Sequence, residues 1–178
     1  TAKRLARETC TVYKEDANRG FRRVIASPIP RKICELNTIK KLLELHNIII
    51  TCGGGGIPVI YTEKGYKGVD AVIDKDRTSA LLASKIKADI LLILTAVDEV
   101  KINYKKENER GLRKLNVEDA KEYIQNGEFA QGSMLPKVEA CIYFLLHSKK
   151  TRAIITSLEK AKEAINGKSG TTIIEGGE

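Results

Sequence analysis

Short apolar runs along the chain alternate with longer segments whose apolar residues recur every three or four positions. The runs at 48–50 and 90–94 consist of apolar residues only, which is typical of strands covered on both faces of a sheet. We therefore predict strands over 48–50 and 89–95. The other predicted strands are at 24–26, 59–61, 69–73, 153–155 and 171–174, with a turn at 63–68.

Apolar residues at helical spacing predict amphipathic helices. The predicted helices span 31–46, 76–88, 116–126 and 135–147, and 101–115 is a charged loop or hairpin. The residues of the last helix that are expected to face the core are Val138, Cys141, Ile142 and Leu145. Asp76 is placed to cap the second helix, and 156–159 has the pattern of a capping box that opens a further helix. Strands that alternate with helices predict an α/β fold, a three-layer αβα sandwich with a mostly parallel sheet.

Length and composition narrow the class of protein. The chain has 178 residues, of which 42% are hydrophobic and 30% are charged, as in a globular domain. No apolar run approaches the roughly 20 residues of a membrane helix, and the first residues contain no apolar signal core, so we expect a cytoplasmic protein without a membrane partner. The net charge of +8 attracts anions. Since only 5% of residues are aromatic, a phosphorylated small molecule is favoured over nucleic acid.

Four consecutive glycines at 53–56 directly follow the predicted strand at 48–50. Such a run costs backbone entropy, so it calls for a reason. One interpretation is that bare N–H groups approach a phosphate or a carboxylate. The other is a tight turn in which two backbones touch. The run is not a Walker A loop, because no Lys-Ser or Lys-Thr pair follows it.

Charged residues occupy two predicted junctions that open helices. Asp74, Lys75 and Asp76 join a strand to a helix, where two carboxylates can orient an ammonium towards an anion at the helix N-terminus. Lys137 lies in the first turn of another helix, where a cation opposes the helix dipole unless it faces negative charge. Plain capping and solvated lysines are the alternatives. The four cysteines form no C-x-x-C pair, so no metal site built from protein ligands is expected.

Several segments, in the same order, resemble those of carbamate kinases, which belong to the amino-acid kinase family. They are 16–28, 53–59, 72–76, 95–98 and 132–137. The resemblance implies an αβα fold, a homodimer and reversible phosphoryl transfer between carbamoyl phosphate and ADP, giving ATP and carbamate with Mg²⁺, as in arginine fermentation. Other members of the amino-acid kinase family share a looser form of the same pattern.

The resemblance also implies roles for individual residues. Lys75 and Lys137 would contact the transferred and β-phosphates, and Asp76 would orient both lysines; these three are the expected catalytic residues. The residues expected to border the nucleotide, besides the two lysines, are Asp74, Thr95, Val97, Asp98, Tyr104 and Met134. The residues expected near the acyl-phosphate end are Gly53, Gly54 and Gly55.

The resemblance covers only the C-terminal, nucleotide-binding part of the family. It implies that residues 1–26 are the remnant of a protruding subdomain and that 27–178 form the nucleotide-binding αβα domain. We therefore expect little activity from this chain alone. A non-catalytic nucleotide-binding fragment, another amino-acid kinase and a basic nucleic-acid-binding domain are the alternative hypotheses.

Overall fold

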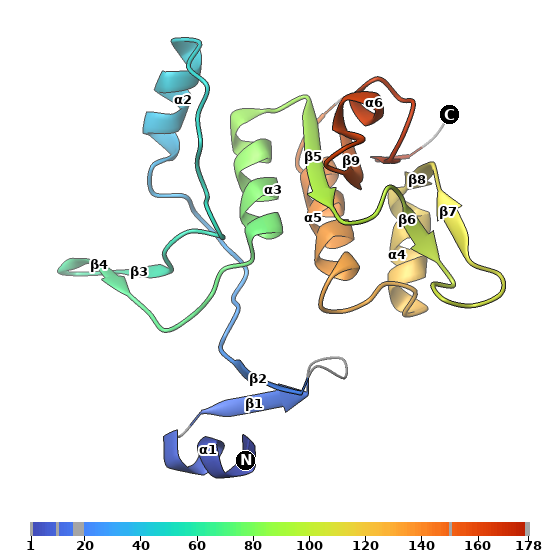
Figure 1. Ribbon diagram of the computed structural model, residues 1–178. Helices are drawn as coiled ribbons and strands as arrows, with labels where there is room; N and C mark the ends of the chain where they lie inside the picture. The colour runs from blue at the N-terminus through green and yellow to red at the C-terminus, as the bar shows by residue number, and fades with distance from the viewer. Residues whose placement is uncertain (1, 10, 16–19, 150, 177–178) are drawn as a thin grey trace. The chain divides into compact units, whose positions relative to one another are not determined.

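The computed structural model describes residues 2–9, 11–15, 20–149 and 151–176 (Figure 1). The chain forms two compact units. One contains residues 1–29 and 57–73, and the other contains 30–56 and 74–178. Across the described residues, no helix combines the length and the apolar character that crossing a membrane requires.

The smaller unit is built from local pairings. Helix α1 spans Ala2–Thr9, and strands β1 (Val12–Glu15) and β2 (Phe21–Val24) pair antiparallel. Strands β3 (Val59–Thr62) and β4 (Gly65–Gly68) form a second antiparallel pair. The predicted strand at 24–26 thus contributes only its first residue.

The β3–β4 pair corrects another prediction. Strand β3 is confirmed, but the strand expected at 69–73 is absent, and β4 occupies part of the expected turn. The register places Tyr61 opposite Tyr66, and their rings meet edge to face with centroids 5.4 Å apart. Such cross-strand aromatic contacts stabilise a hairpin, which explains why the chain pairs here rather than at the more apolar segment that follows.

The larger unit has a four-stranded sheet in the order β5-β9-β10-β8. The strands are β5 (Ile90–Thr95), β8 (Lys114–Asn116), β9 (Arg152–Ser157) and β10 (Thr171–Ile174). β5 is parallel to β9 and β10 is parallel to β8, whereas β9 and β10 are antiparallel. The charged segment predicted as a loop or hairpin contains the antiparallel pair β6 (Val100–Ile102) and β7 (Arg110–Leu112). The partly parallel sheet with helices agrees with the predicted α/β fold.

The predicted helices are present with shifted ends. They are α2 (Leu36–Glu44), α3 (Lys75–Ile86), α4 (Val117–Gln125), α5 (Met134–Leu146) and α6 (Ala161–Ile165). The cap of α3 is Asp74 and not Asp76, because the Asp74 Oδ1 atom accepts the N–H groups of Asp76 and Arg77. An N-cap must precede the N–H groups that it satisfies, and Asp76 already lies inside the first turn.

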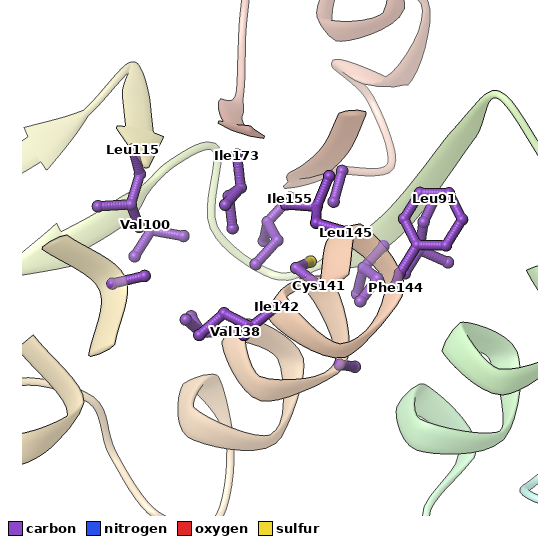
Figure 2. Close-up of a cluster of buried hydrophobic side chains, with 14 of the residues drawn as sticks. Leu91, Val100, Leu115, Val138, Cys141, Ile142, Phe144, Leu145, Ile155 and Ile173 are labelled. Carbon is purple, nitrogen blue, oxygen red and sulfur yellow. The ribbon is translucent and has the colours of Figure 1, made fainter. Parts of the chain in front are cut away.

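The core of the larger unit lies between α5 and the sheet (Figure 2). The four α5 residues predicted to face inward, Val138, Cys141, Ile142 and Leu145, are all buried. They belong to one cluster with residues of the strands, among them Leu91 of β5, Ile155 of β9 and Ile173 of β10. The helical spacing of α5 therefore identified its buried face correctly.

The capping box predicted at 156–159 is wrong. Thr156 and Ser157 are the last residues of β9, both are buried, and α6 begins only at Ala161 without a side-chain cap. Neither hydroxyl has a hydrogen-bond partner among the described residues. Pairing of β9 with β5 extends to Ser157, so both residues belong to the sheet, and the helix begins after them.

The strand predicted at 48–50 is also absent. Residues 47–52 have no regular secondary structure, and the side chains of Ile48 and Ile50 face solvent. Helix α2, which precedes them, is shorter than predicted, and Ile39 is its only buried residue. Backbone groups of a strand need a neighbour to bond with, and the described residues provide none for this segment.

Candidate active site

The N-termini of α3 and α5 lie at the carboxyl edge of the parallel strands. Only 87–89 separate α3 from β5, and only 147–151 separate α5 from β9. Because a short connection makes a helix run back along the next strand, both helices begin where β5 and β9 end. Open α/β sheets bind their ligands at such an edge.

Asp76 brings two lysines together at this edge. The Lys137 ammonium donates a hydrogen bond of 2.8 Å to Asp76 Oδ2, and the Lys75 ammonium lies 3.6 Å from the same oxygen. The side chains of Lys137 and Asp76 are 12% and 8% exposed, whereas that of Lys75 is 57% exposed. The Asp76 carboxylate thus fixes one ammonium in a mostly covered position and holds a second one that is open to solvent.

A second ion pair joins the same two helices. The Arg77 guanidinium donates a hydrogen bond of 2.8 Å to Glu139 Oε2. Together with the contact between Lys137 and Asp76, it links the first turn of α3 to the first two turns of α5. No sequence pattern predicts this pair, since the partners are 62 residues apart and no local pattern connects them.

Cys141 lies one turn further along α5. Burial raises the pKa of its thiol strongly, and the negative charge of Asp76 raises that pKa further. The raised pKa disfavours the thiolate that nucleophilic chemistry needs.

The glycine turn is attached to α3. The Gly55 N–H donates to the Cys52 carbonyl at 2.7 Å, and the Thr78 hydroxyl donates to the Gly55 carbonyl at 2.9 Å. Positive φ angles occur at Gly53 (42°), Gly55 (126°) and Gly56 (89°). Thr78 is not among the predicted site residues, because its position inside a predicted helix gives no sign of this contact.

The space around the glycine run and its backbone angles bear on the two explanations. A Cβ atom added to Gly53, Gly54 or Gly56 would meet nothing within 4 Å, so no second backbone among the described residues touches the turn at these positions. Gly53 and Gly56 nevertheless need positive φ angles, which only glycine adopts without cost. The turn therefore leaves open space beside its bare backbone.

The remaining nucleotide candidates lie on neighbouring elements. Thr95 ends β5 and is partly buried, with Val97 partly buried and Asp98 exposed in the turn that follows. Met134 is the first residue of α5. Tyr104 is exposed in the turn between β6 and β7, and within the described chain no hydrogen bond or ion pair connects it to Lys75, Asp76 or Lys137.

The β6–β7 turn that carries Tyr104 is held by charged groups. The Lys101 ammonium lies 2.6 Å from Glu109 Oε1, and the Lys105 N–H donates to Glu109 Oε2 at 2.9 Å. The hydrogen bond from Lys101 lowers the pKa of the Glu109 carboxyl, and the same bond raises the pKa of Lys101.

The described residues contain no cluster of three or more His, Cys, Asp or Glu side chains that could hold a metal ion.

Known proteins resemble this chain along almost all of its length. It is 51% identical over 172 residues to carbamate kinase 3 of Staphylococcus aureus (strain USA300), which covers 97% of this chain and 56% of that protein. It is 52% identical over 174 residues to the carbamate kinase-like protein YqeA of Escherichia coli (strain K12), covering 98% and 56%. The chain thus spans little more than half the length of these curated relatives.

Solved structures show the same likeness. The structure of carbamate kinase from Giardia lamblia bound to AMP-PNP superposes with a TM-score of 0.86 at 43% identity, covering 98% of this chain and 55% of that one. Residues 8–157 match the amino acid kinase family as a whole. With this match and relatives at about half identity, the chain belongs to the amino acid kinase family.

Proposed function

We propose that this chain is the nucleotide-binding part of a carbamate kinase. The reaction would be reversible phosphoryl transfer between carbamoyl phosphate and ADP, giving ATP and carbamate. The observation that carries the proposal is the cluster of Lys75, Asp76 and Lys137 at the N-termini of α3 and α5. Relatives at about 50% identity that are named carbamate kinases support it, as does the related structure bound to AMP-PNP.

The lysines act in this proposal by neutralising charge. Phosphoryl transfer passes through a loose transition state whose charge is spread over the phosphoryl oxygens, so positioning and electrostatic stabilisation supply most of the catalysis. Lys137, held by Asp76 at 2.8 Å, is already oriented before the ligand arrives. Lys75, which is more exposed, can turn towards the nucleotide phosphates while Asp76 limits its range.

The surrounding residues bind the two ends of the reacting pair. We propose that Asp74, Thr95, Val97, Asp98, Tyr104 and Met134 border the nucleotide. Gly53, Gly54 and Gly55 would lie at the acyl-phosphate end, where the space beside Gly53 and Gly54 is open. Thr78 links the two ends, since it bonds the glycine turn from within α3.

Magnesium fits this donor set as a companion of the nucleotide. Mg²⁺ usually keeps several waters and binds through substrate phosphates with one or two carboxylates, without a dedicated protein cage. Asp74 is the candidate carboxylate beside the lysines, and its Oδ1 atom is engaged with two backbone N–H groups. The ion would neutralise phosphate charge, while the chain's own lysines hold the phosphoryl group in place.

The assembly and location of the protein are further parts of the proposal. We propose that residues 27–178 act as the nucleotide-binding domain, that 1–26 belong to a protruding subdomain, and that the carbamate kinase is a cytoplasmic homodimer. Sedimentation velocity of the carbamate kinase with and without Mg·ADP measures the assembly directly.

Calorimetry with Mg·ADP tests the binding site. The wild-type chain should bind, and Lys75→Met and Lys137→Met should each weaken binding about ten-fold to a hundred-fold, because each removes a charge-assisted hydrogen bond. Lys85→Met is the matched control, since Lys85 lies exposed in the last turn of the same helix. Absence of Mg·ADP binding by folded wild-type protein would contradict the proposal.

Turnover tests the chemistry. ATP formation from carbamoyl phosphate and ADP by the carbamate kinase should fall about 10²–10³-fold in Lys137→Met, by analogy with the loss of one preorganised donor. Lys85→Met should retain normal turnover. Near-normal turnover in a folded Lys137→Met variant would show that Lys137 takes no part in the transfer.

A further inference from the structure

Thr78 makes an unusual pair of contacts inside α3. Its buried hydroxyl lies 2.9 Å from the Gly55 carbonyl and 3.1 Å from the Asp74 carbonyl. The Asp74 carbonyl already accepts the Thr78 backbone N–H at 3.0 Å, as in any helix. The hydroxyl has one proton to donate, and Gly55 is a buried residue whose carbonyl needs a donor. The hydrogen bond to the Gly55 carbonyl is therefore the one that the Thr78 side chain adds to the backbone hydrogen bonds of the helix.

This contact determines the orientation of one peptide group in the glycine turn. The carbonyl of Gly55 and the N–H of Gly56 belong to the same trans peptide and point in opposite directions. Holding the carbonyl towards Thr78 therefore turns the Gly56 N–H away from α3. A Cβ atom at Gly56 would meet nothing within 4 Å, so the space beside this residue is open.

A glycine on each side of the peptide makes the restraint necessary. Gly55 and Gly56 both have positive φ angles, and glycine adopts positive and negative φ with similar ease. The peptide between them could rotate at little cost without an external bond. The Gly55 N–H is already used by the Cys52 carbonyl, so the Thr78 hydroxyl supplies the second restraint on this turn.

We propose that Thr78 is a positioning residue that aims the Gly56 N–H at a phosphoryl oxygen of an acyl phosphate. The inference rests on the proposed function and adds Gly56 to the substrate contacts. Thr78 itself does not touch the substrate: it acts through the Gly55 carbonyl. Removing the hydroxyl frees the peptide to rotate and weakens acyl-phosphate binding, while the nucleotide contacts of Lys75 and Lys137 remain.

Nuclear magnetic resonance of the ¹⁵N-labelled chain tests this, because it observes the Gly56 amide directly. Fresh carbamoyl phosphate is titrated into wild type, Thr78→Val, Thr78→Ser and Ser84→Ala. Thr78→Val keeps the shape without the hydroxyl, and Thr78→Ser keeps the hydroxyl. Ser84→Ala is the control, since the Ser84 hydroxyl donates only within α3, to the Leu81 carbonyl.

The expected result is a shift of the Gly56 amide in wild type, Thr78→Ser and Ser84→Ala. In Thr78→Val the shift should be lost or should require about three- to ten-fold more carbamoyl phosphate, the effect of one neutral hydrogen bond. Mg·ADP affinity, measured by calorimetry on the same samples, should agree within two-fold in all four proteins. If Thr78→Val does not fold, Thr78→Ala makes the same comparison with a better helix former.

Other results would overturn the inference. If Thr78→Val binds carbamoyl phosphate like wild type, or if wild type binds Mg·ADP but shows no Gly56 shift, Thr78 does not position this peptide for the substrate. Either result would leave the proposed nucleotide site standing. Failure of the folded wild type to bind Mg·ADP would count against the proposed function as well.

Discussion

Two apolar runs of the larger unit have similar sequences, but only one of them forms a strand. The run in β5 pairs along its whole length with β9, and its residues Leu91 and Ile93 are each 6% exposed. The run at 48–50 has no strand partner among the described residues, and Ile48 and Ile50 are 98% and 100% exposed. Both patterns predict a strand buried on two faces. A strand forms, however, only where neighbours satisfy its backbone and cover its side chains.

The two runs also lie next to different parts of the candidate active site. β5 lies in the region where α3 and α5 carry the paired charges of Asp76 and Lys137. The 48–50 segment leads into the glycine turn, which is held at its far end by the hydrogen bond from Thr78. Packed helices support the lysines, whereas two hydrogen bonds, one within the turn and one from Thr78, hold the glycines. Four changes test this contrast.

The largest effect is expected from truncating the covered run. Ile93→Ala should lower the free energy of unfolding by about 2–5 kcal/mol, because it removes a buried side chain and leaves a cavity. Ile50→Ala is the matched control and should change it by less than about 0.5 kcal/mol, since the side chain is exposed. Urea denaturation measures both. If the two substitutions lowered the free energy of unfolding equally, the contrast between the runs would be contradicted.

The next largest effect should come from the buried ion pair. Lys137→Met should destabilise the fold by about 3 kcal/mol, because it leaves the covered Asp76 carboxylate without its near partner. Lys75→Met should cost less than about 1 kcal/mol, since that ammonium is mostly exposed. Thermal and urea unfolding provide the comparison. A Lys137→Met variant as stable as wild type would mean that Lys75 or water fully replaces the lost cation.

A smaller effect is expected at the exposed run. Ile48 and Ile50 place apolar surface in solvent, and such surface promotes association. Sedimentation velocity should show concentration-dependent self-association of wild type that the double variant Ile48→Lys with Ile50→Lys reduces. The urea midpoint should stay nearly unchanged, as neither side chain is buried. Wild-type chain that stays monomeric at all concentrations would contradict the prediction.

The smallest effect concerns the β6–β7 turn, which is exposed like residues 48–50 but is paired. Because the pKa of Glu109 is lowered, its charged carboxylate stabilises the turn fully above the ordinary value of 4.5. This stabilisation is lost as pH falls through the lowered value. Because the pKa of Lys101 is raised, its ammonium stabilises the turn fully below the ordinary value of 10.5. This stabilisation is lost as pH rises through the raised value. The pair should therefore hold the turn between these limits.

The Lys105 amide reports on this pair, since its N–H donates to Glu109. Its chemical shift should titrate with a midpoint below 4.5 in wild type and should not follow that titration in Glu109→Gln. A wild-type midpoint at or above the ordinary carboxyl value would show that Lys101 does not stabilise the charged form.

The sequence by itself determined the elements whose pattern is local. The spacing of Val138, Cys141, Ile142 and Leu145 identified the buried face of α5, because the side chains of a helix repeat on one face whatever lies opposite. The apolar run of β5 and the α/β alternation were predicted for the same reason. The candidate residues Lys75, Asp76 and Lys137 could be named from their positions at helix starts, although their contacts could not.

Only the tertiary structure decided which partners meet. It made Asp74 the cap of α3 and left Asp76 to the two lysines. It joined Arg77 to Glu139 and Thr78 to Gly55, and it left 48–50 exposed. The physical reason is that a hydrogen bond, an ion pair or a strand pairing needs two groups at a set distance. A linear pattern specifies one of these groups, and the packing of distant elements supplies the other.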